Sequence, residues 1–150
     1  MRDPKAATSS IRYAEQLPAQ EAFLRLFDST GWQTSLPAER MVAALDASWH
    51  CVCAYAGDRL VGMGRTLSDG AIHALIVEVI VEPQWQGHGV GREIVERLVR
   101  HCRDAGIDQV QLFCAEGKRQ FYERLGFQAR PDDAPGMQLD GEDPLIGQPG

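Results

Sequence analysis

Residues 72–91, IHALIVEVIVEPQWQGHGVG, join a long apolar run to a turn that holds three glycines. The run over Ile72–Glu82 predicts a β-strand buried on both faces, because apolar residues fill almost every position instead of alternating with polar ones. After the turn, apolar residues from Val90 to Cys102 recur at the spacing of one helix face. We therefore expect a buried strand, a glycine turn and a helix over about 89–105, which favours an α/β fold.

The elements around this unit follow from the same kinds of pattern. After an initial strand, two helices and the two strands of a hairpin are expected over residues 18–29, 37–47, 49–56 and 59–67. A strand, a short helix and a last strand are expected over residues 107–114, 118–125 and 127–130. The predicted fold is a mixed sheet of six to seven strands with helices on both faces, because a strand buried on both sides must be covered twice.

Length and composition limit the classes of protein. The chain has 150 residues, of which 44% are apolar, enough for one domain with a continuous core. We expect this domain over residues 1–140, with residues 1–8 frayed and residues 141–150 forming a disordered tail. The net charge of -6 argues against a nucleic-acid partner. The sequence shows neither a bilayer-spanning apolar run nor the core of a signal peptide, so we expect a cytoplasmic protein without a membrane partner.

The four cysteines do not form a metal-binding pattern. They contain no C-x-x-C pair, and Cys51 and Cys53 have no histidine-rich segment nearby to complete a zinc site. Together with Cys102 and Cys114 they are interpreted as buried, reduced thiols. We expect no metal cofactor.

The glycine turn is typical of a phosphate site. Amide groups at the start of a helix point outward without partners, and the helix dipole favours an anion there. The spacing of Gly87, Gly89 and Gly91 is G-x-G-x-G, not the G-x-G-x-x-G of dinucleotide-binding folds, and no Gly-Lys-Ser/Thr follows as in a P-loop. A tight connection that binds no ligand stays open as the alternative.

Two segments resemble a known family. Residues 79–91, VIVEPQWQGHGVG, are similar to the acyl-CoA-binding motif of GNAT superfamily N-acetyltransferases, whose core is Gln/Arg-x-x-Gly-x-Gly/Ala. Residues 121–127, FYERLGF, resemble the segment that often carries the general acid of that family. The resemblance covers roughly residues 8–140. It implies a sheet that splays between strands 4 and 5, and acetyl-CoA as the co-substrate.

The resemblance also implies where the cofactor binds. The peptide-like pantetheine arm would meet the backbone of the strand residues Val79, Ile80 and Val81, which the splay leaves without a neighbouring strand. The pyrophosphate would be held by the turn and first helix residues, namely Gln86, Gly87, His88, Gly89, Val90, Gly91 and Arg92. Two positions depart from the family pattern: Ala115 stands where many members carry Asn, and Lys118 where many carry Ala. Lys118 and Arg119 therefore have two interpretations, as CoA-phosphate ligands or as solvated helix residues.

By the same resemblance, Tyr122 is the candidate general acid for the departing thiolate. Glu78 interrupts an apolar strand and is the candidate base or amine-binding carboxylate, because burying an unpaired carboxylate is costly. An ion pair between Glu78 and Arg65 is the alternative, and His73 is a weaker candidate base.

The expected reaction transfers the acetyl group to a primary amine, most simply a small molecule. The substrate pocket is expected near Trp32, Trp49 and Arg65, and either Trp32 or Tyr13 could stack on an amine cation. A protein amine as acceptor, a non-catalytic acyl-CoA-binding module and an interaction domain with an empty turn remain alternatives. A homodimer is left open.

Overall fold

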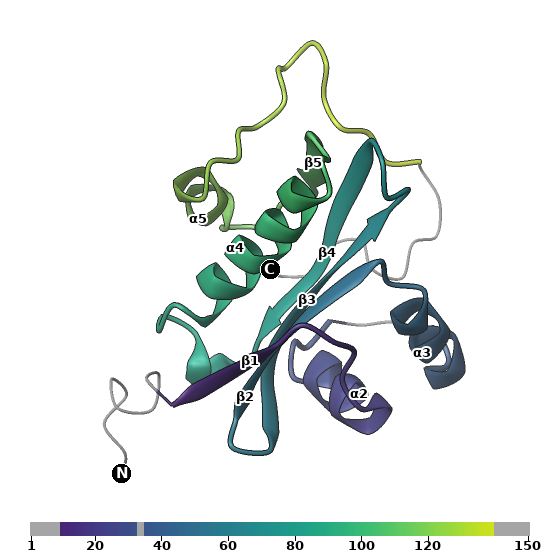
Figure 1. Cartoon of the computed structure of the whole chain (residues 1–150), viewed down its shortest axis with the longest axis vertical. Coiled ribbons are helices and arrows are strands. Elements are labelled where there is room, and N and C mark those ends of the chain that lie inside the picture. The colour runs from purple at the N-terminus through teal and green to yellow at the C-terminus, as the bar shows by residue number, and fades with distance from the viewer. Residues whose placement is uncertain (1–9, 33–34, 140–150) are drawn as a thin grey trace.

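The computed structural model describes residues 10–32 and 35–139 (Figure 1). The expectations for residues 1–8 and 141–150 lie outside this part of the chain. Five strands form one sheet in sequence order, namely β1 (Ile11–Ala14), β2 (His50–Ala56), β3 (Arg59–Ser68), β4 (His73–Val81) and β5 (Gln109–Leu112). The first four strands pair antiparallel, and β5 lies parallel to β4. The sheet is therefore mixed, as predicted.

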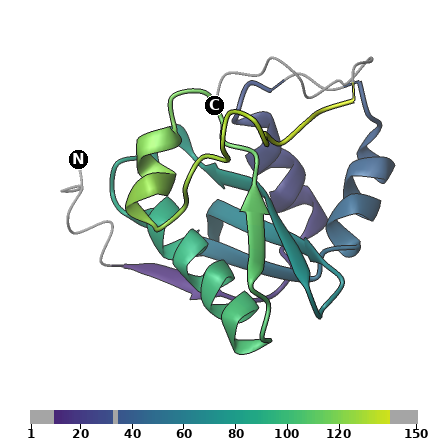
Figure 2. The ribbon, with the colours of Figure 1, turned by 90° about the horizontal axis from the view of Figure 1, so that it is seen from above.

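Helices cover both faces of the sheet. The helices are α2 (Gln20–Asp28), α3 (Ala38–Asp46), α4 (Val90–Asp104) and α5 (Arg119–Arg124), and a short 3-10 helix, η1 (Pro83–Trp85), precedes α4. Figure 2 shows α4 on one side of the sheet and α2 and α3 on the other. Two separate sets of buried residues, one under α2 and α3 and one under α4, fill these two layers. In the described part of the chain, no helix is both long and apolar enough to cross a membrane.

The number of strands is lower than predicted. Within the described residues the sheet has five strands, not six to seven, and residues 127–130 form none. The amide of Phe127 donates to the carbonyl of Tyr122 at 3.1 Å, so this segment closes the end of α5. The prediction of a last strand was wrong because a strand needs a ladder partner, which local sequence does not reveal.

Two glycines of β3 let α4 lie close to the sheet. A Cβ atom at Gly64 would stand 2.9 Å from side-chain atoms of both Ile94 and Leu98, and one at Gly62 would stand 3.1 Å from Ile94. Ile94 and Leu98 are fully buried, so they have little room to move. The missing side chains fix the height of α4 above the sheet, and with it the place of the glycine turn at its N-terminus.

Candidate active site

A cleft of about 750 Å³ opens where β4 and β5 part. The two strands pair only as far as Ile76 and Leu112, while β4 continues to Val81. The cleft is lined along this unpaired stretch by residues 76–81, at one end by the glycine turn, and on the far side by residues that precede and form α5. The predicted splay between strands 4 and 5 is thus confirmed, and it leaves an edge of β4 facing the cleft.

A β-bulge lies in the middle of that edge. Met63 pairs with Ile80 and Arg65 with Val77, so one residue of β3 faces two of β4. Glu78 is one of the two, and its φ of 52° lies in the left-handed region. A bulge bends its strand and redirects a side chain, and a left-handed residue other than glycine costs roughly 1 kcal/mol or more. The bulge gives the polar residue of an apolar strand a place in the cleft.

The Glu78 carboxylate is bound on both oxygens by one arginine. Arg65 donates from Nε to Oε2 at 2.7 Å and from Nη2 to Oε1 at 3.2 Å. Its Nη1 also reaches the carbonyl of Ala44 at 3.2 Å and the hydroxyl of Ser48 at 3.3 Å. Of the two interpretations that the sequence allows, the ion pair is present in the structure, and both partners line the cleft. His73 is exposed at the opposite end of β4, away from the cleft lining.

The glycine turn is shaped by positive φ angles and by one side chain. Gly87 and Gly89 have φ angles of 79° and 85°, and Gly89 is the N-cap of α4. The Gln86 side chain donates from Nε2 to the carbonyl of Val81 at 2.9 Å, which ties the turn to the end of β4. The first amide groups of α4 have no acceptor within the helix. They are therefore available to an anion at the cleft.

Most of the predicted cofactor residues line the cleft. They are Val79, Ile80, Val81, Gln86, Gly87, Gly89, Gly91 and Arg92. His88 and Val90 lie outside the lining, and Val90 is 1% exposed in the core under α4. Val90 can therefore contribute only through its backbone.

Tyr122 lies across the cleft from β4, on α5. Its ring packs edge-on against Phe121 at 4.9 Å and Phe127 at 5.9 Å between centroids. Burial, with a smaller contribution from Cys114, raises the pKa of Tyr122 to about 12. The phenol is therefore protonated across the neutral range and can act as a donor.

The comparisons with known proteins match this geometry. Residues 13–127 match the family model described as Acetyltransferase (GNAT) family. The chain belongs to the GNAT acetyltransferase family. A GNAT-family acetyltransferase from Streptococcus pneumoniae TIGR4 has the same fold, with a TM-score of 0.77 and 27% identity over 89% of this chain and 99% of that one.

Curated GNAT relatives are longer than this chain. Histone acetyltransferase TAP1 from Glycine max is 36% identical in an alignment 123 residues long that covers 75% of this chain and 53% of the relative. GCN5-related N-acetyltransferase 2, chloroplastic, from Arabidopsis thaliana is 34% identical over 132 residues, covering 75% and 51% respectively. The chain thus spans about half the length of these two relatives.

One buried acid of this GNAT domain escapes prediction from sequence. Glu82, directly after β4, is 3% exposed and accepts from Arg25 Nη1 at 2.9 Å and from Arg59 Nε at 3.1 Å, with a second, shorter contact to Arg59. Arg25 also donates to the carbonyl of Leu60 at 2.8 Å. The cluster ties α2 and β3 to the start of the glycine turn. The sequence signal is an acid between an apolar strand and Pro83, but only the tertiary structure brings the arginines to it.

Some basic residues near the GNAT cleft line it, and others are paired with a glutamate on their own helix. Lys118 and Arg124 line the cleft. Arg119 is paired with Glu123 at 3.5 Å, and Arg92, although it lines the cleft, donates to Glu96 at 2.8 Å. Sequence analysis considered three of these four and missed Arg124, because a basic residue at the end of a short helix has no specific pattern.

The other end of the cleft is partly aromatic. Phe27 and Trp32 line it, with ring centroids 5.7 Å apart in an edge-on arrangement, beside Ser29 and Thr30. Trp32 and Arg65 are placed at the cleft as expected. Trp49 packs instead against His101, at 4.8 Å between centroids. Tyr13 lies under the Arg97 guanidinium at 4.9 Å, also away from the cleft. The expected roles of Trp49 and Tyr13 in the pocket are therefore not supported by their positions.

Proposed function

We propose that this chain is an N-acetyltransferase that moves an acetyl group from acetyl-CoA to a primary amine by direct attack in a ternary complex. The observation that carries the proposal is one cleft in which an unpaired strand edge, a glycine turn at a helix N-terminus and a protonated phenol meet. Each feature suits one part of the reaction: the strand edge suits the pantetheine amides, the turn suits the pyrophosphate, and the phenol suits the leaving thiolate.

Cofactor binding uses mainly the backbone. The amides from Gly87 to Arg92 surround the pyrophosphate, while Val79 and Val81 offer backbone groups to the pantetheine arm, as a neighbouring strand would. Lys118 and Arg124, both exposed at the cleft, meet the remaining phosphate charge of CoA. This direction of entry places the thioester near the bulge at Glu78 and the ring of Tyr122.

The chemistry requires the nitrogen to lose two protons and the sulfur to gain one. An alkylamine with a pKa near 10 must lose a proton before its lone pair can attack the thioester carbonyl. As the C–N bond forms and the C–S bond breaks, Tyr122 donates a proton to the sulfur. The second proton of the nitrogen restores the phenol, so the products are the amide, the free thiol and one proton. Glu78 binds the amine or takes its proton through water, using carboxylate lone pairs that the two bonds from Arg65 leave free.

The acceptor is most simply a small amine whose apolar part packs on Phe27 and Trp32. A protein amine is the second candidate, because the name of the Glycine max relative is histone acetyltransferase. A non-catalytic module that only binds acyl-CoA is the third, and it differs from the other two in having no turnover.

A thiol-release assay with acetyl-CoA separates these candidates. The acceptor panel contains polyamines, amino sugars, aminoglycosides, arylalkylamines and lysine peptides. Turnover with a small amine supports the proposal, turnover with peptides alone supports the second candidate, and a thermal shift with acetyl-CoA but no turnover supports the third. If acetyl-CoA causes no thermal shift and no acceptor is turned over, the assignment of the cleft is overturned.

Gly89→Val tests the phosphate turn directly. The substitution should abolish the thermal shift with acetyl-CoA, because a side chain there blocks the approach of the pyrophosphate to the backbone. Gly106→Val is the matched control. Gly106 follows the C-terminal end of the same helix and has a φ of 79°. As at Gly89, no heavy atom lies within 4 Å of the position that a Cβ atom would take. Both variants carry the same backbone strain. If Gly89→Val retains the shift, the turn does not bind the cofactor.

A further inference from the structure

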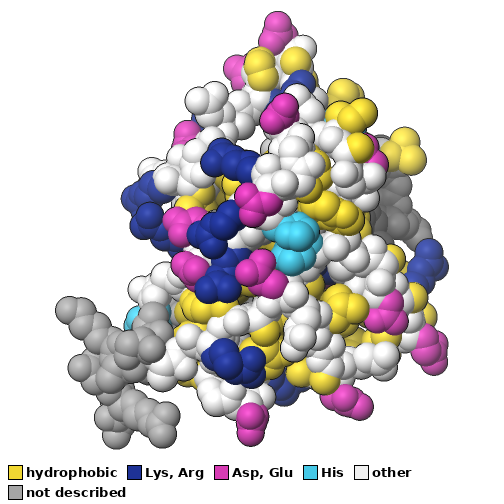
Figure 3. All heavy atoms as spheres, viewed as in Figure 1, with side chains coloured by type: hydrophobic (Ala, Val, Ile, Leu, Met, Phe, Trp, Pro, Cys, Tyr) yellow, Lys and Arg dark blue, Asp and Glu magenta, His cyan; other side chains and the backbone are white. Residues whose placement is uncertain are grey.

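A second cluster of polar side chains lies at the other end of α4. Glu15 follows β1, His50 begins β2, and His101 is in the last turn of α4. The helix separates His101 from the glycine turn by about 18 Å at 1.5 Å per residue. None of the three residues lines the active-site cleft. On the face that carries α4, Figure 3 shows a histidine patch among basic and acidic side chains.

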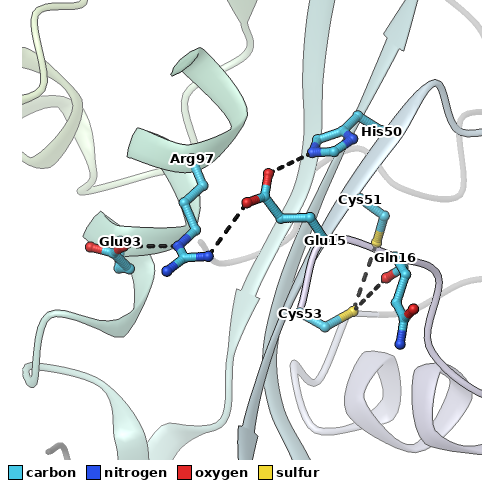
Figure 4. Close-up of polar contacts among 7 residues, drawn as sticks. All are labelled: Glu15, Gln16, His50, Cys51, Cys53, Glu93 and Arg97. Atoms are coloured by element: carbon cyan, nitrogen blue, oxygen red, sulfur yellow. Dashed lines mark hydrogen bonds and ion pairs between the residues drawn. The ribbon is translucent and has the colours of Figure 1, made fainter. Parts of the chain in front are cut away.

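The two imidazoles and the carboxylate lie close together. The rings of His50 and His101 are stacked at 3.6 Å between centroids, only 5° from parallel. Glu15 Oε1 is 2.9 Å from His50 Nε2, as Figure 4 shows. One ligand atom from each residue, taken together, lies within 4.8 Å of the other two. Three segments far apart in sequence therefore bring two imidazoles and one carboxylate within reach of one ion.

We propose that Glu15, His50 and His101 bind one divalent first-row transition metal ion, with Zn²⁺ as the best fit. Zinc takes imidazole nitrogen at about 2.0–2.1 Å and carboxylate oxygen at about 2.0–2.2 Å, often as three protein ligands with water in the fourth position. Ligand atoms in such a tetrahedral site are about 3.3 Å apart. A metal ion lies in the plane of each imidazole that it binds, so binding requires the two stacked rings to turn apart while one nitrogen of each stays near the Glu15 carboxylate. The cysteine pattern, which predicts no metal, is unrelated to this site.

The surroundings hold the ligands in place. Arg97 lies 3.4 Å from Glu15 Oε2, the oxygen that does not face His50, and its Nε is held by Glu93 at 2.9 Å (Figure 4). A partner on the second carboxylate oxygen orients a metal ligand, although the positive charge of Arg97 also weakens the attraction of the site for a cation.

The site is structural, not part of the acetyl-transfer chemistry. It joins the end of β1, the start of β2 and the last turn of α4, so bound metal would stabilise the native state in proportion to its concentration. A hard ion that prefers oxygen ligands, such as Mg²⁺, suits a site with two imidazoles poorly.

Metal binding is measured on chelator-treated protein in the absence of acetyl-CoA. Zn²⁺ titrated by calorimetry should bind with a stoichiometry of one and raise the melting temperature, whereas Mg²⁺ should leave it unchanged. His101→Gln and Glu15→Gln should each weaken Zn²⁺ binding by about ten-fold or more. The matched control is His73→Gln, because His73 is an exposed histidine outside the cluster, and it should bind Zn²⁺ as the unmodified chain does.

Cobalt distinguishes this site from the thiols. The Sγ atoms of Cys51 and Cys53 are 3.8 Å apart, and Cys114 is exposed, so thiolates could also take up a soft metal. Co²⁺ at the proposed site should show d–d absorption without a thiolate charge-transfer band. Circular dichroism and the metal-free melting temperature show whether each variant is folded. The proposal is overturned if the chain binds no Zn²⁺, if Co²⁺ shows thiolate ligation, or if folded His101→Gln binds as tightly as His73→Gln.

Discussion

Glu78 and Glu82 lie four residues apart at the end of the same strand, and arginines bind both carboxylates. The buried partner differs between the two ion pairs. At Glu82 the acid is buried, with 4% of its side chain exposed, while Arg25 and Arg59 are 38% and 53% exposed. At Glu78 the arginine is the more buried partner, since the Arg65 side chain is 7% exposed and that of Glu78 is 17% exposed.

The difference indicates that the two acidic residues have different roles, a structural one for Glu82 and one in the cleft for Glu78. The Glu82 ion pairs tie α2 and β3 to the start of the glycine turn, and both arginines stay partly exposed to water. The Glu78 pair keeps a buried cation beside the cleft, on a bulge with an unfavourable φ of 52°. A strained polar residue that the surrounding structure holds in place is more typical of a functional site than of a structural one.

Tyr122→Phe should have the largest effect. The variant keeps the ring contacts with Phe121 and Phe127 and removes only the donor, so the fold and the affinity for acetyl-CoA should be retained. The value of kcat should fall about 100-fold or more, which is the contribution of a general acid and equals about 2.7 kcal/mol. Steady-state kinetics with an accepted amine measure it. A rate close to that of the unmodified enzyme would mean that water protonates the thiolate.

Glu78→Gln should rank second, and its main effect should be on stability. Removing the charge leaves Arg65 buried beside a neutral amide, which should lower the free energy of unfolding by about 2 kcal/mol. The loss should be smaller than for a buried arginine left without any acceptor, because the carbonyl of Ala44 and the hydroxyl of Ser48 still accept from Arg65. Urea unfolding measures the loss. The double variant Glu78→Gln/Arg65→Met is the control and should recover much of the stability. If the single variant is as stable as the unmodified chain, the pair does not hold Arg65.

The kinetics of Glu78→Gln test its proposed role in the cleft. If Glu78 binds the amine, KM for the amine should rise while kcat changes less. If Glu78 takes the proton, kcat should fall and the acidic limb of the pH profile should change.

Glu82→Gln should have a smaller effect, although Glu82 is the more buried acid. Arg25 and Arg59 are partly exposed, so water can solvate them after the charge is lost, and we expect a loss of about 1.5 kcal/mol. The value of kcat for the folded variant should stay within a few-fold of the original. The free energy of unfolding and kcat are measured for Glu78→Gln and Glu82→Gln under one set of conditions. The assignment of a structural role to Glu82 is wrong if Glu82→Gln loses activity without losing stability.

The sequence predicts the local parts of this site and misses the parts that depend on tertiary structure. The glycine turn is predictable because its phosphate chemistry follows from a few neighbouring residues. Tyr122 is a candidate only because residues 121–127 resemble a family motif. The bulge at Glu78 depends on the register between β3 and β4, and a local pattern does not encode register. The arginines around Glu82 come from segments 23 and 57 residues away, so no pattern around Pro83 reveals them.

The smallest effect that we predict concerns alkaline pH. Burial raises the pKa of Tyr122 to about 12 in the folded chain, whereas an unfolded tyrosine titrates near 10. Below about pH 10 both states keep the proton, and the full stability is present. Between about pH 10 and 12 the unfolded chain loses this proton first, so the folded state loses stability as pH rises, by about 1 kcal/mol at pH 11.

Tyr13 and Tyr55 also have raised pKa values, so they add to the alkaline loss of the unmodified chain. Tyr122→Phe removes only the contribution of Tyr122, because the other two tyrosines remain. The measurement is therefore urea unfolding of both chains at about pH 9 and about pH 11, with the variant expected to lose about 1 kcal/mol less between the two. An equal loss in both chains would mean that the Tyr122 hydroxyl titrates normally in the folded state. Burial would then not hold the phenol in its protonated form above about pH 10, although the phenol would still be protonated at neutral pH.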